Sequence, residues 1–114
     1  MQESKNYQRT YDLLANELHI PMKYKGFVQL VDIISFKSEN LLVSNQTIYK
    51  QVSKKYNVTT SAISNNIGKI VNVANGVITQ EEKDKYFKAS IYNGGYITTS
   101  TFINSLANYI HAKM

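Results

Sequence analysis

The stretch SNQTIYKQVSKKYNVTTSAISNNIGKIVNVANG, from Ser44 to Gly76, decides the fold of this chain. In its first part Ile48, Val52 and Tyr56 recur every four residues, which places them on one face of a helix. The second part repeats the same helical spacing of apolar side chains, at Ile63, Ile67, Ile70, Val71 and Ala74. The stretch therefore predicts two consecutive helices, each with one apolar face.

The residues between these two helices predict a tight turn. Asn57 tolerates the left-handed backbone that a sharp turn needs. Thr59 or Thr60 offers a side-chain oxygen to cap the second helix, and Gly76 is expected to end it. This layout is typical of a helix-turn-helix, whose second helix enters the major groove of DNA.

Two residues of the predicted second helix depart from the common pattern. Asn66 stands where many helix-turn-helix units place an aliphatic residue, so we expect a helix that is longer or rotated relative to the commonest form. Gly68 in mid-helix costs about 1 kcal/mol relative to Ala. Close approach to DNA explains this glycine, and close packing against another helix is the alternative explanation.

The charge pattern favours a polyanionic partner. No Asp or Glu occurs from Asn40 to Gln80, whereas this window contains Lys50, Lys54, Lys55 and Lys69. The whole chain carries a formal charge of +5 and has a pI near 9.4. Such a window suits contacts with DNA phosphates. The alternative is an ordinary helical hairpin with a solvated polar face.

Composition also excludes several classes of protein. The 114 residues suggest one domain, spanning 1–114, and the absence of cysteine removes disulfides and thiolate chemistry. No apolar run approaches the roughly 18 residues of a membrane span, and the N-terminus lacks the apolar core of a signal peptide. We therefore expect a cytoplasmic protein with no membrane partner. His19 has no nearby ligand residues, and no catalytic motif is present, so we expect no metal, no cofactor and no enzyme activity.

The rest of the chain predicts further helices around the central pair. Helical patterns cover residues 3–18, 26–36, 79–89 and 99–110, which gives an all-α fold of about six helices. Thr79 and Glu82 form a capping-box pattern, and Thr98 or Thr99 caps the last helix. Leu41 and Leu42 are expected to reach the core from a loop. A flexible turn is expected at residues 93–95. It is flanked by residues typical of strands, which are Tyr92, Tyr96 and Ile97.

Four stretches of the chain resemble the C-terminal DNA-binding effector domain of the sporulation master response regulator, stage zero sporulation protein A. They are LLANELHIPMKYKGFVQLVDII (13–34), IYKQVSKKYNVTTSAISNNI (48–67), the helix tail through 73–74, and ITTSTFINSLANYI (97–110). In the family the first stretch has a helix, then Ile or Val before Pro, then Lys-Gly-aromatic at the start of the next helix. Here these residues are Ile20, Pro21, Lys25, Gly26 and Phe27, and the order and spacing hold over about residues 11–112.

The resemblance implies a helix-turn-helix domain that binds double-stranded DNA, with two differences from the family. Full-length members carry an N-terminal phospho-receiver domain, for which this chain is too short, so we expect phosphorylation-driven dimerisation not to carry over. At four positions where the family carries charged side chains that read bases, this chain has different residues, so we expect a different DNA sequence preference. These residues are Ser64, Asn65, Gly68 and Lys69.

Candidate DNA-contacting residues follow from the predicted geometry. The apolar face of the second helix must turn inward, so a row of polar residues faces base edges: Ser61, Ser64, Asn65, Gly68 and Lys69. Asn65 is the best single candidate because an Asn side chain can pair bidentately with adenine. The predicted phosphate contacts lie around this row, at Lys23, Lys25, Lys50, Lys54, Lys55 and Thr60.

The leading hypothesis is a sequence-specific transcriptional regulator that binds double-stranded DNA, as a dimer on paired half-sites. RNA polymerase or a mobile-element protein is a further candidate partner. One alternative is a DNA-binding accessory factor of a mobile element, acting in plasmid transfer, replication or partition. Another is a protein-interaction module that has lost DNA binding, which the absence of Arg near the second helix favours.

Overall fold

The computed structural model describes residues 4–87 and 95–113, and within them the fold is all-α, as predicted. A π-helical segment, η1, directly continues the first helix. The helices are α1 (Tyr7–Asp12), η1 (Leu13–Glu17), α2 (Gly26–Glu39), α3 (Asn45–Tyr56), α4 (Thr60–Val77), α5 (Gln80–Phe87) and α6 (Thr99–Ala112).

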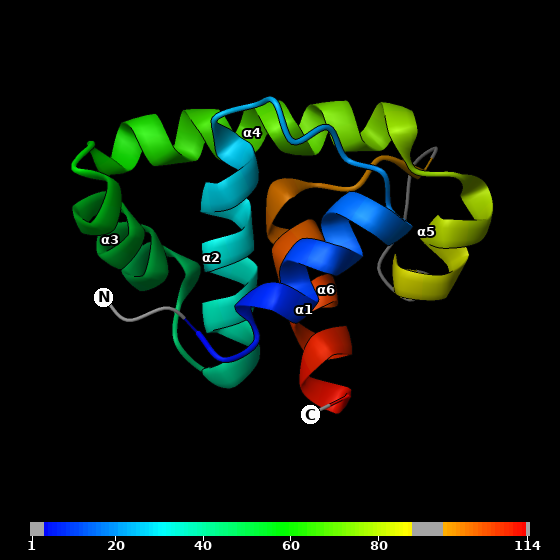
Figure 1. Ribbon diagram of the computed structural model, residues 1–114, viewed down its shortest axis with the longest axis horizontal. Helices are drawn as coiled ribbons and strands as arrows, with labels where there is room; N and C mark the ends of the chain where they lie inside the picture. Colours follow the sequence, from blue (N-terminus) through cyan, green and yellow to red (C-terminus); the bar gives the residue numbers. More distant parts are fainter. Residues whose placement is uncertain (1–3, 88–94, 114) are drawn as a thin grey trace.

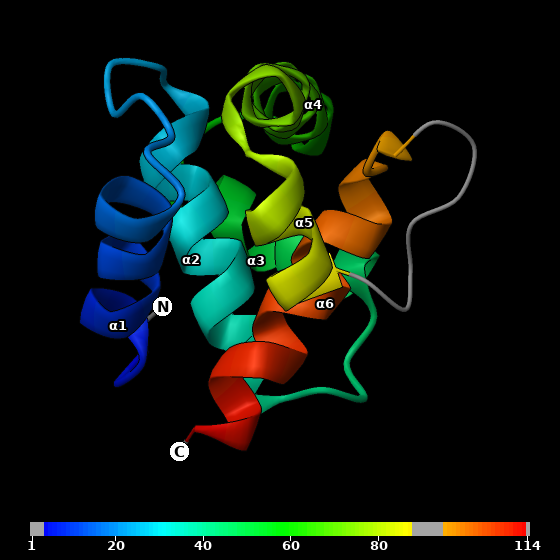
Figure 2. The ribbon, with the colours of Figure 1, turned by 90° about the vertical axis from the view of Figure 1, so that its right-hand side faces the viewer.

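Helix α2 forms the centre of the molecule and packs against α1, α3, α4 and α6. The inward positions predicted for it are confirmed, since the five apolar residues Phe27, Leu30, Val31, Ile33 and Ile34 are at most 1% exposed. Helix α4 spans one side of the molecule, with α3 beneath one of its ends and α5 beneath the other (Figure 1). A view along α4 places α1 and the start of α2 on one flank of it and the start of α6 on the other (Figure 2). Long parts of α4 therefore remain on the outside of the molecule.

The predicted turn between α3 and α4 is confirmed in detail. Asn57 has φ 54° and ψ 48°, the left-handed conformation that closes α3. The Thr59 side chain accepts a hydrogen bond of 3.0 Å from the backbone N–H of Ala62 and so caps α4. Ser44 caps α3 in the same way, accepting from the backbone N–H of Thr47 at 3.2 Å. The conformation of Asn57 and the Thr59 cap fix the connection between the two helices, and the Ser44 cap fixes the start of α3.

The predicted end of α4 at Gly76 is wrong. The helix continues to Val77, and its C-cap is Ile78, whose N–H donates to the carbonyl of Ala74 at 2.9 Å. Ile78 is buried, so this short extension brings one more apolar side chain to the core. The gain from burying this isoleucine explains why the helix does not stop at the glycine.

The expectation that Leu42 reaches the core is also wrong. Helix α2 runs to Glu39, three residues beyond its predicted end at Phe36, and only a short turn remains before α3. In this turn Leu41 is half-buried against the core, whereas Leu42 is fully exposed. The turn is too short to bury two consecutive leucines, whose side chains point in different directions.

The predicted caps of the last two helices are confirmed. Thr79 and Glu82 form the reciprocal capping box, with bonds of 2.9 and 3.2 Å, and Thr98 caps α6. Ile97 bonds through its backbone N–H and C=O to the side-chain amide of Asn75 on α4. The predicted turn at 93–95 and Tyr92 lie largely outside the described residues, as do residues 88–89 at the predicted end of α5. No described helix is long and apolar enough to cross a membrane.

Candidate nucleic-acid interface

Helix α4 has an apolar inner face and a polar outer face. The residues predicted to point inward are confirmed as core, because Ile63, Ile67, Ile70, Val71 and Ala74 are fully buried. On the opposite side Ser61, Asn65 and Lys69 are exposed to solvent. The structure thus brings these three predicted base-reading residues together on one row along the helix.

Ser64 and Gly68 occupy a different position, on the flank of α4 that faces α3 and α6. They line a groove of about 420 Å³ with residues from the starts of these two helices. The other lining residues are Asn45, Gln46, Tyr49, Thr99 and Ser100. Burial raises the pKa of the Tyr49 phenol, which therefore stays neutral and can donate a hydrogen bond. This polar flank could not be predicted from periodicity, because it requires the packing of three separate segments.

Gly68 is not required by packing among the residues that the structure describes. A Cβ atom built at this position meets none of their atoms within 4 Å. Close packing against another helix, the alternative explanation for this glycine, is therefore wrong. The space beside Gly68 opens onto the groove and the outer face of α4.

The sequence interpretation missed Asn72 as a member of the outer row. Asn72 is exposed and lies seven residues after Asn65, about two helical turns, which returns it to the same helical face. The spacing of the polar residues alone indicates this position for Asn72. The motif does not, because Asn72 lies beyond the usual length of its second helix.

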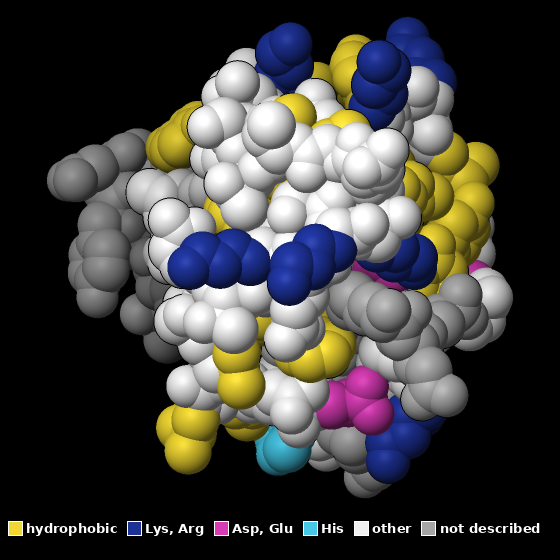
Figure 3. Space-filling view, turned by 90° about the vertical axis from the view of Figure 1, so that its left-hand side faces the viewer, with side chains coloured by type: hydrophobic (Ala, Val, Ile, Leu, Met, Phe, Trp, Pro, Cys, Tyr) yellow, Lys and Arg dark blue, Asp and Glu magenta, His cyan; other side chains and the backbone are white. Residues whose placement is uncertain are grey.

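Lysines border the outer face of α4 on the α3 side. Lys50 and Lys54 are exposed and lie four residues apart, on one face of α3. Viewed from the α3 end of the molecule, Lys and Arg side chains form a row across the middle of the surface and recur at its upper edge (Figure 3). The row provides positive charge on the face of the molecule at the α3 end.

The other flank of α4 carries Lys23 and Lys25. Both are exposed, and Lys25 occupies the N-cap position of α2, where it makes no side-chain capping bond. The start of α2 touches α4 closely: a Cβ built at Gly26 would lie 2.4 Å from the backbone oxygen of Asn66. These two lysines are therefore held beside the middle of α4, next to backbone N–H groups at a helix start.

The comparison with protein families decides the identity of the fold. The family model described as "Sporulation initiation factor Spo0A C terminal" matches residues 11–110. The chain belongs to this family. Spo0A C-terminal domains are the DNA-binding part of a sporulation transcription regulator, so the chain carries a DNA-binding fold.

Within this Spo0A C-terminal fold, Lys55 is placed differently from the other predicted phosphate contacts. Its ammonium group lies 2.8 Å from Asp32 of α2, and its side chain is only 28% exposed. Thr60 is exposed at the first residue of α4, beside the capping residue Thr59. The structure therefore leaves Thr60, Lys50 and Lys54 on the surface, whereas the ammonium group of Lys55 is paired with the buried Asp32.

The described residues contain no group of three or more His, Cys, Asp or Glu side chains that could hold a metal ion. His19 is exposed and has φ 56°, so it serves as the left-handed residue after η1. The second groove of the molecule, about 360 Å³, lies away from α4 and is lined by Glu17, Glu81, Glu82, Lys85 and Tyr86. Three of its five lining residues are acidic, which is unsuited to binding DNA.

Proposed function

We propose that this protein is a transcription regulator that recognises a specific double-stranded DNA sequence by inserting α4 into the major groove. The observation that carries the proposal is the outer row of α4, which is polar and exposed, directly opposite a fully buried apolar row. Lysines lie on both flanks of this row. Membership of the Spo0A C-terminal family supports the same mode of binding.

The outer row supplies the base contacts. Asn65 lies at its centre, and its amide can donate to N7 and accept from N6 of adenine in the bidentate pattern. Ser61, Lys69 and Asn72 extend the row along the groove. The open space beside Gly68 lets the helix backbone approach base edges closely, which the short side chains of the row require.

The flanks supply the phosphate contacts. Lys50 and Lys54 serve one strand from α3, with Thr60 at the start of α4. Lys23 and Lys25 serve the other strand, next to the start of α2, which has no side-chain cap. Contacts on both sides of the inserted helix fix its register on the duplex without reading sequence.

A single domain of this kind buries only about 600–1,000 Å² on DNA, which is small for tight specific binding. We therefore propose paired half-sites, occupied by two copies and separated by about 10 base pairs or a multiple. A footprint that protects one isolated short site at 1:1 stoichiometry would contradict this part of the proposal.

The test is selection of binding sites from random-sequence duplexes, followed by gel shift with the selected site. Asn65→Ala is expected to cost about 1–3 kcal/mol on the selected site and little on random DNA. Asn108→Ala is the matched control, because Asn108 is an exposed asparagine on α6, away from the outer row of α4. Failure to enrich any sequence, together with wild-type behaviour of Asn65→Ala, would favour a protein-interaction module instead. Sites confined to a transfer or replication origin would indicate a mobile-element accessory factor.

A further inference from the structure

A polar stripe runs along α2 through the centre of the molecule. It consists of four residues spaced three apart, each at most 6% exposed: Gln29, Asp32, Ser35 and Ser38. Buried polar side chains need hydrogen-bond partners, and the stripe bonds to two other parts of the chain, the N-terminal segment and the helix-turn-helix. At the far end Ser38 accepts from Asn6 at 2.8 Å, and the backbone oxygen of Ser35 accepts from Ser4 at 3.2 Å. The other two members bond to the helix-turn-helix.

The first of these bonds explains the unusual Asn66. Its side-chain N–H donates to the Gln29 side-chain oxygen at 3.2 Å, from α4 to α2. The backbone oxygen of the same asparagine packs against Gly26, one turn earlier on α2. An aliphatic residue at position 66 would provide neither the donor nor a partner for the buried Gln29.

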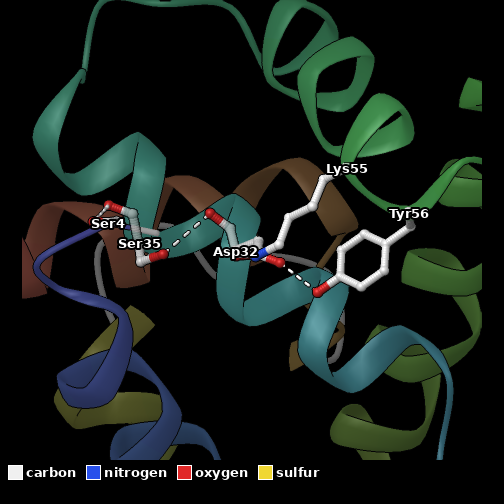
Figure 4. Close-up of polar contacts among 5 residues, drawn as sticks. All are labelled: Ser4, Asp32, Ser35, Lys55 and Tyr56. Carbon is white, nitrogen blue, oxygen red and sulfur yellow. Dashed lines mark hydrogen bonds and ion pairs between the residues drawn. The ribbon is translucent and has the colours of Figure 1, made fainter. Parts of the chain in front are cut away.

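The second attachment to the helix-turn-helix is a group of polar side chains around the buried Asp32. Its carboxylate is 1% exposed and receives the ammonium of Lys55 at 2.8 Å and the hydroxyl of Tyr56, which donates at 2.5 Å. Figure 4 shows both side chains reaching from the end of α3 toward this carboxylate. The Lys55 ammonium also lies 5.6 Å and 5.5 Å from the ring centroids of Tyr7 and Tyr56. Lys55 is thus held between α1, α2 and α3.

These two attachments hold the helix-turn-helix at separate points. Asn66 lies in the middle of α4, and Lys55 and Tyr56 are the last two residues of α3. Two fixed points prevent rotation of the α3–α4 pair on α2, whereas apolar packing alone tolerates small rotations. Helix α2 also carries Lys25 at its start, so the attachments set the distance between this phosphate contact and the outer row of α4.

We propose that Gln29 and Asp32 are positioning residues for DNA recognition, which orient α3 and α4 through Asn66, Lys55 and Tyr56. In this arrangement Lys55 acts through Asp32 and makes no phosphate contact. The inference rests on the proposed DNA-binding function. It agrees with the general behaviour of buried polar pairs, which add little net stability over apolar packing and in some proteins select one geometry.

The first experiment measures the salt dependence of binding to the selected duplex. Lys54→Ala is the control and is expected to reduce the log–log slope by about 0.9, the value for one lost phosphate contact. The double variant Asp32→Asn with Lys55→Gln keeps the formal net charge and removes the ion pair that joins α3 to α2. Its slope is expected to equal that of the wild type. A slope reduced by about 0.9 would show that Lys55 contacts a phosphate and would overturn its assigned role.

The second experiment separates positioning from stability. The double variant Gln29→Leu with Asn66→Leu replaces a polar pair by an apolar one, which is expected to preserve or raise the Tm. We expect each double variant to bind the selected site about tenfold more weakly than the wild type does. Its affinity for random duplex is expected to equal that of the wild type. Wild-type discrimination in both folded double variants would overturn the positioning role. Absence of salt-dependent binding by the wild type would instead refute the proposed function itself.

Discussion

Replacement of Gly26 by alanine tests the closest approach between α2 and α4. The new Cβ would lie 2.4 Å from the backbone oxygen of Asn66, 3.0 Å from its carbonyl carbon and 3.2 Å from Cγ2 of Ile70. Ordinary van der Waals contact begins at 3.4 Å. Two of the three atoms belong to the backbone, so no side-chain rotation relieves the clash. The two helices must separate by about 1 Å, which disturbs the densely packed core between them.

The expected cost follows from this displacement. Overpacking of a core typically costs about 1–3 kcal/mol. Alanine regains at most about 1 kcal/mol of helix propensity, and less at the first helical position than in the interior. The net loss is therefore about 1–2 kcal/mol. An unfolding entropy of about 2.1 cal/mol/K per residue converts this loss to a Tm lower by about 4–8 °C for a chain of this size.

Gly68→Ala is the matched control, because a Cβ there meets no atom within 4 Å. It is expected to raise the free energy of unfolding by up to about 1 kcal/mol, and the Tm by up to about 4 °C. Urea unfolding followed by circular dichroism measures both variants. A Gly26→Ala protein as stable as the wild type would refute the close contact of α2 with α4. A destabilised Gly68→Ala protein would refute the open space beside that residue.

Three further substitutions test single features of the fold. Thr59→Ala removes the cap of α4 and is expected to cost about 1 kcal/mol in urea unfolding, and an unchanged midpoint would contradict the cap. Leu42→Ala is expected to change stability by less than about 0.5 kcal/mol, because this side chain is fully exposed, and a larger loss would place Leu42 in the core. Burial, and secondly the negative charge of Glu17, raise the pKa of Tyr86. The unfolded phenol therefore ionises above about pH 10 while the folded one stays neutral, so stability falls as the pH rises further. Tyr86→Phe should make this fall between pH 9 and 11 shallower, and an equal fall in both proteins would contradict the shifted pKa.

Apolar periodicity predicted the helices and most of the core. Ile63, Ile67 and Ile70 appear in the sequence with the spacing of one helical face, and the structure buries all three. Capping residues were equally readable, because a cap bonds to backbone groups only three residues away, as Thr79 does with Glu82. Both signals are local, so no knowledge of the tertiary structure was needed.

The buried polar contacts were not predictable in this way. Asp32 lies 23 residues from Lys55, and Gln29 lies 37 residues from Asn66. A buried polar residue on α2 looks the same in the sequence as one on a solvated face. The sequence therefore predicts Lys55 as a phosphate contact together with its neighbour Lys54, because only the packing of α3 on α2 distinguishes the two.

The two off-pattern residues of α4 have opposite explanations, and this difference bears on function. Asn66 is accounted for within the protein, by its bond to Gln29 and its contact with Gly26. Gly68 lowers helix stability by about 1 kcal/mol relative to alanine, and no contact within residues 4–87 and 95–113 requires it. A cost with no internal compensation is expected where an outside partner approaches the backbone. Because Gly68 opens onto the outer face of α4, the proposed approach of DNA to this face would supply that compensation.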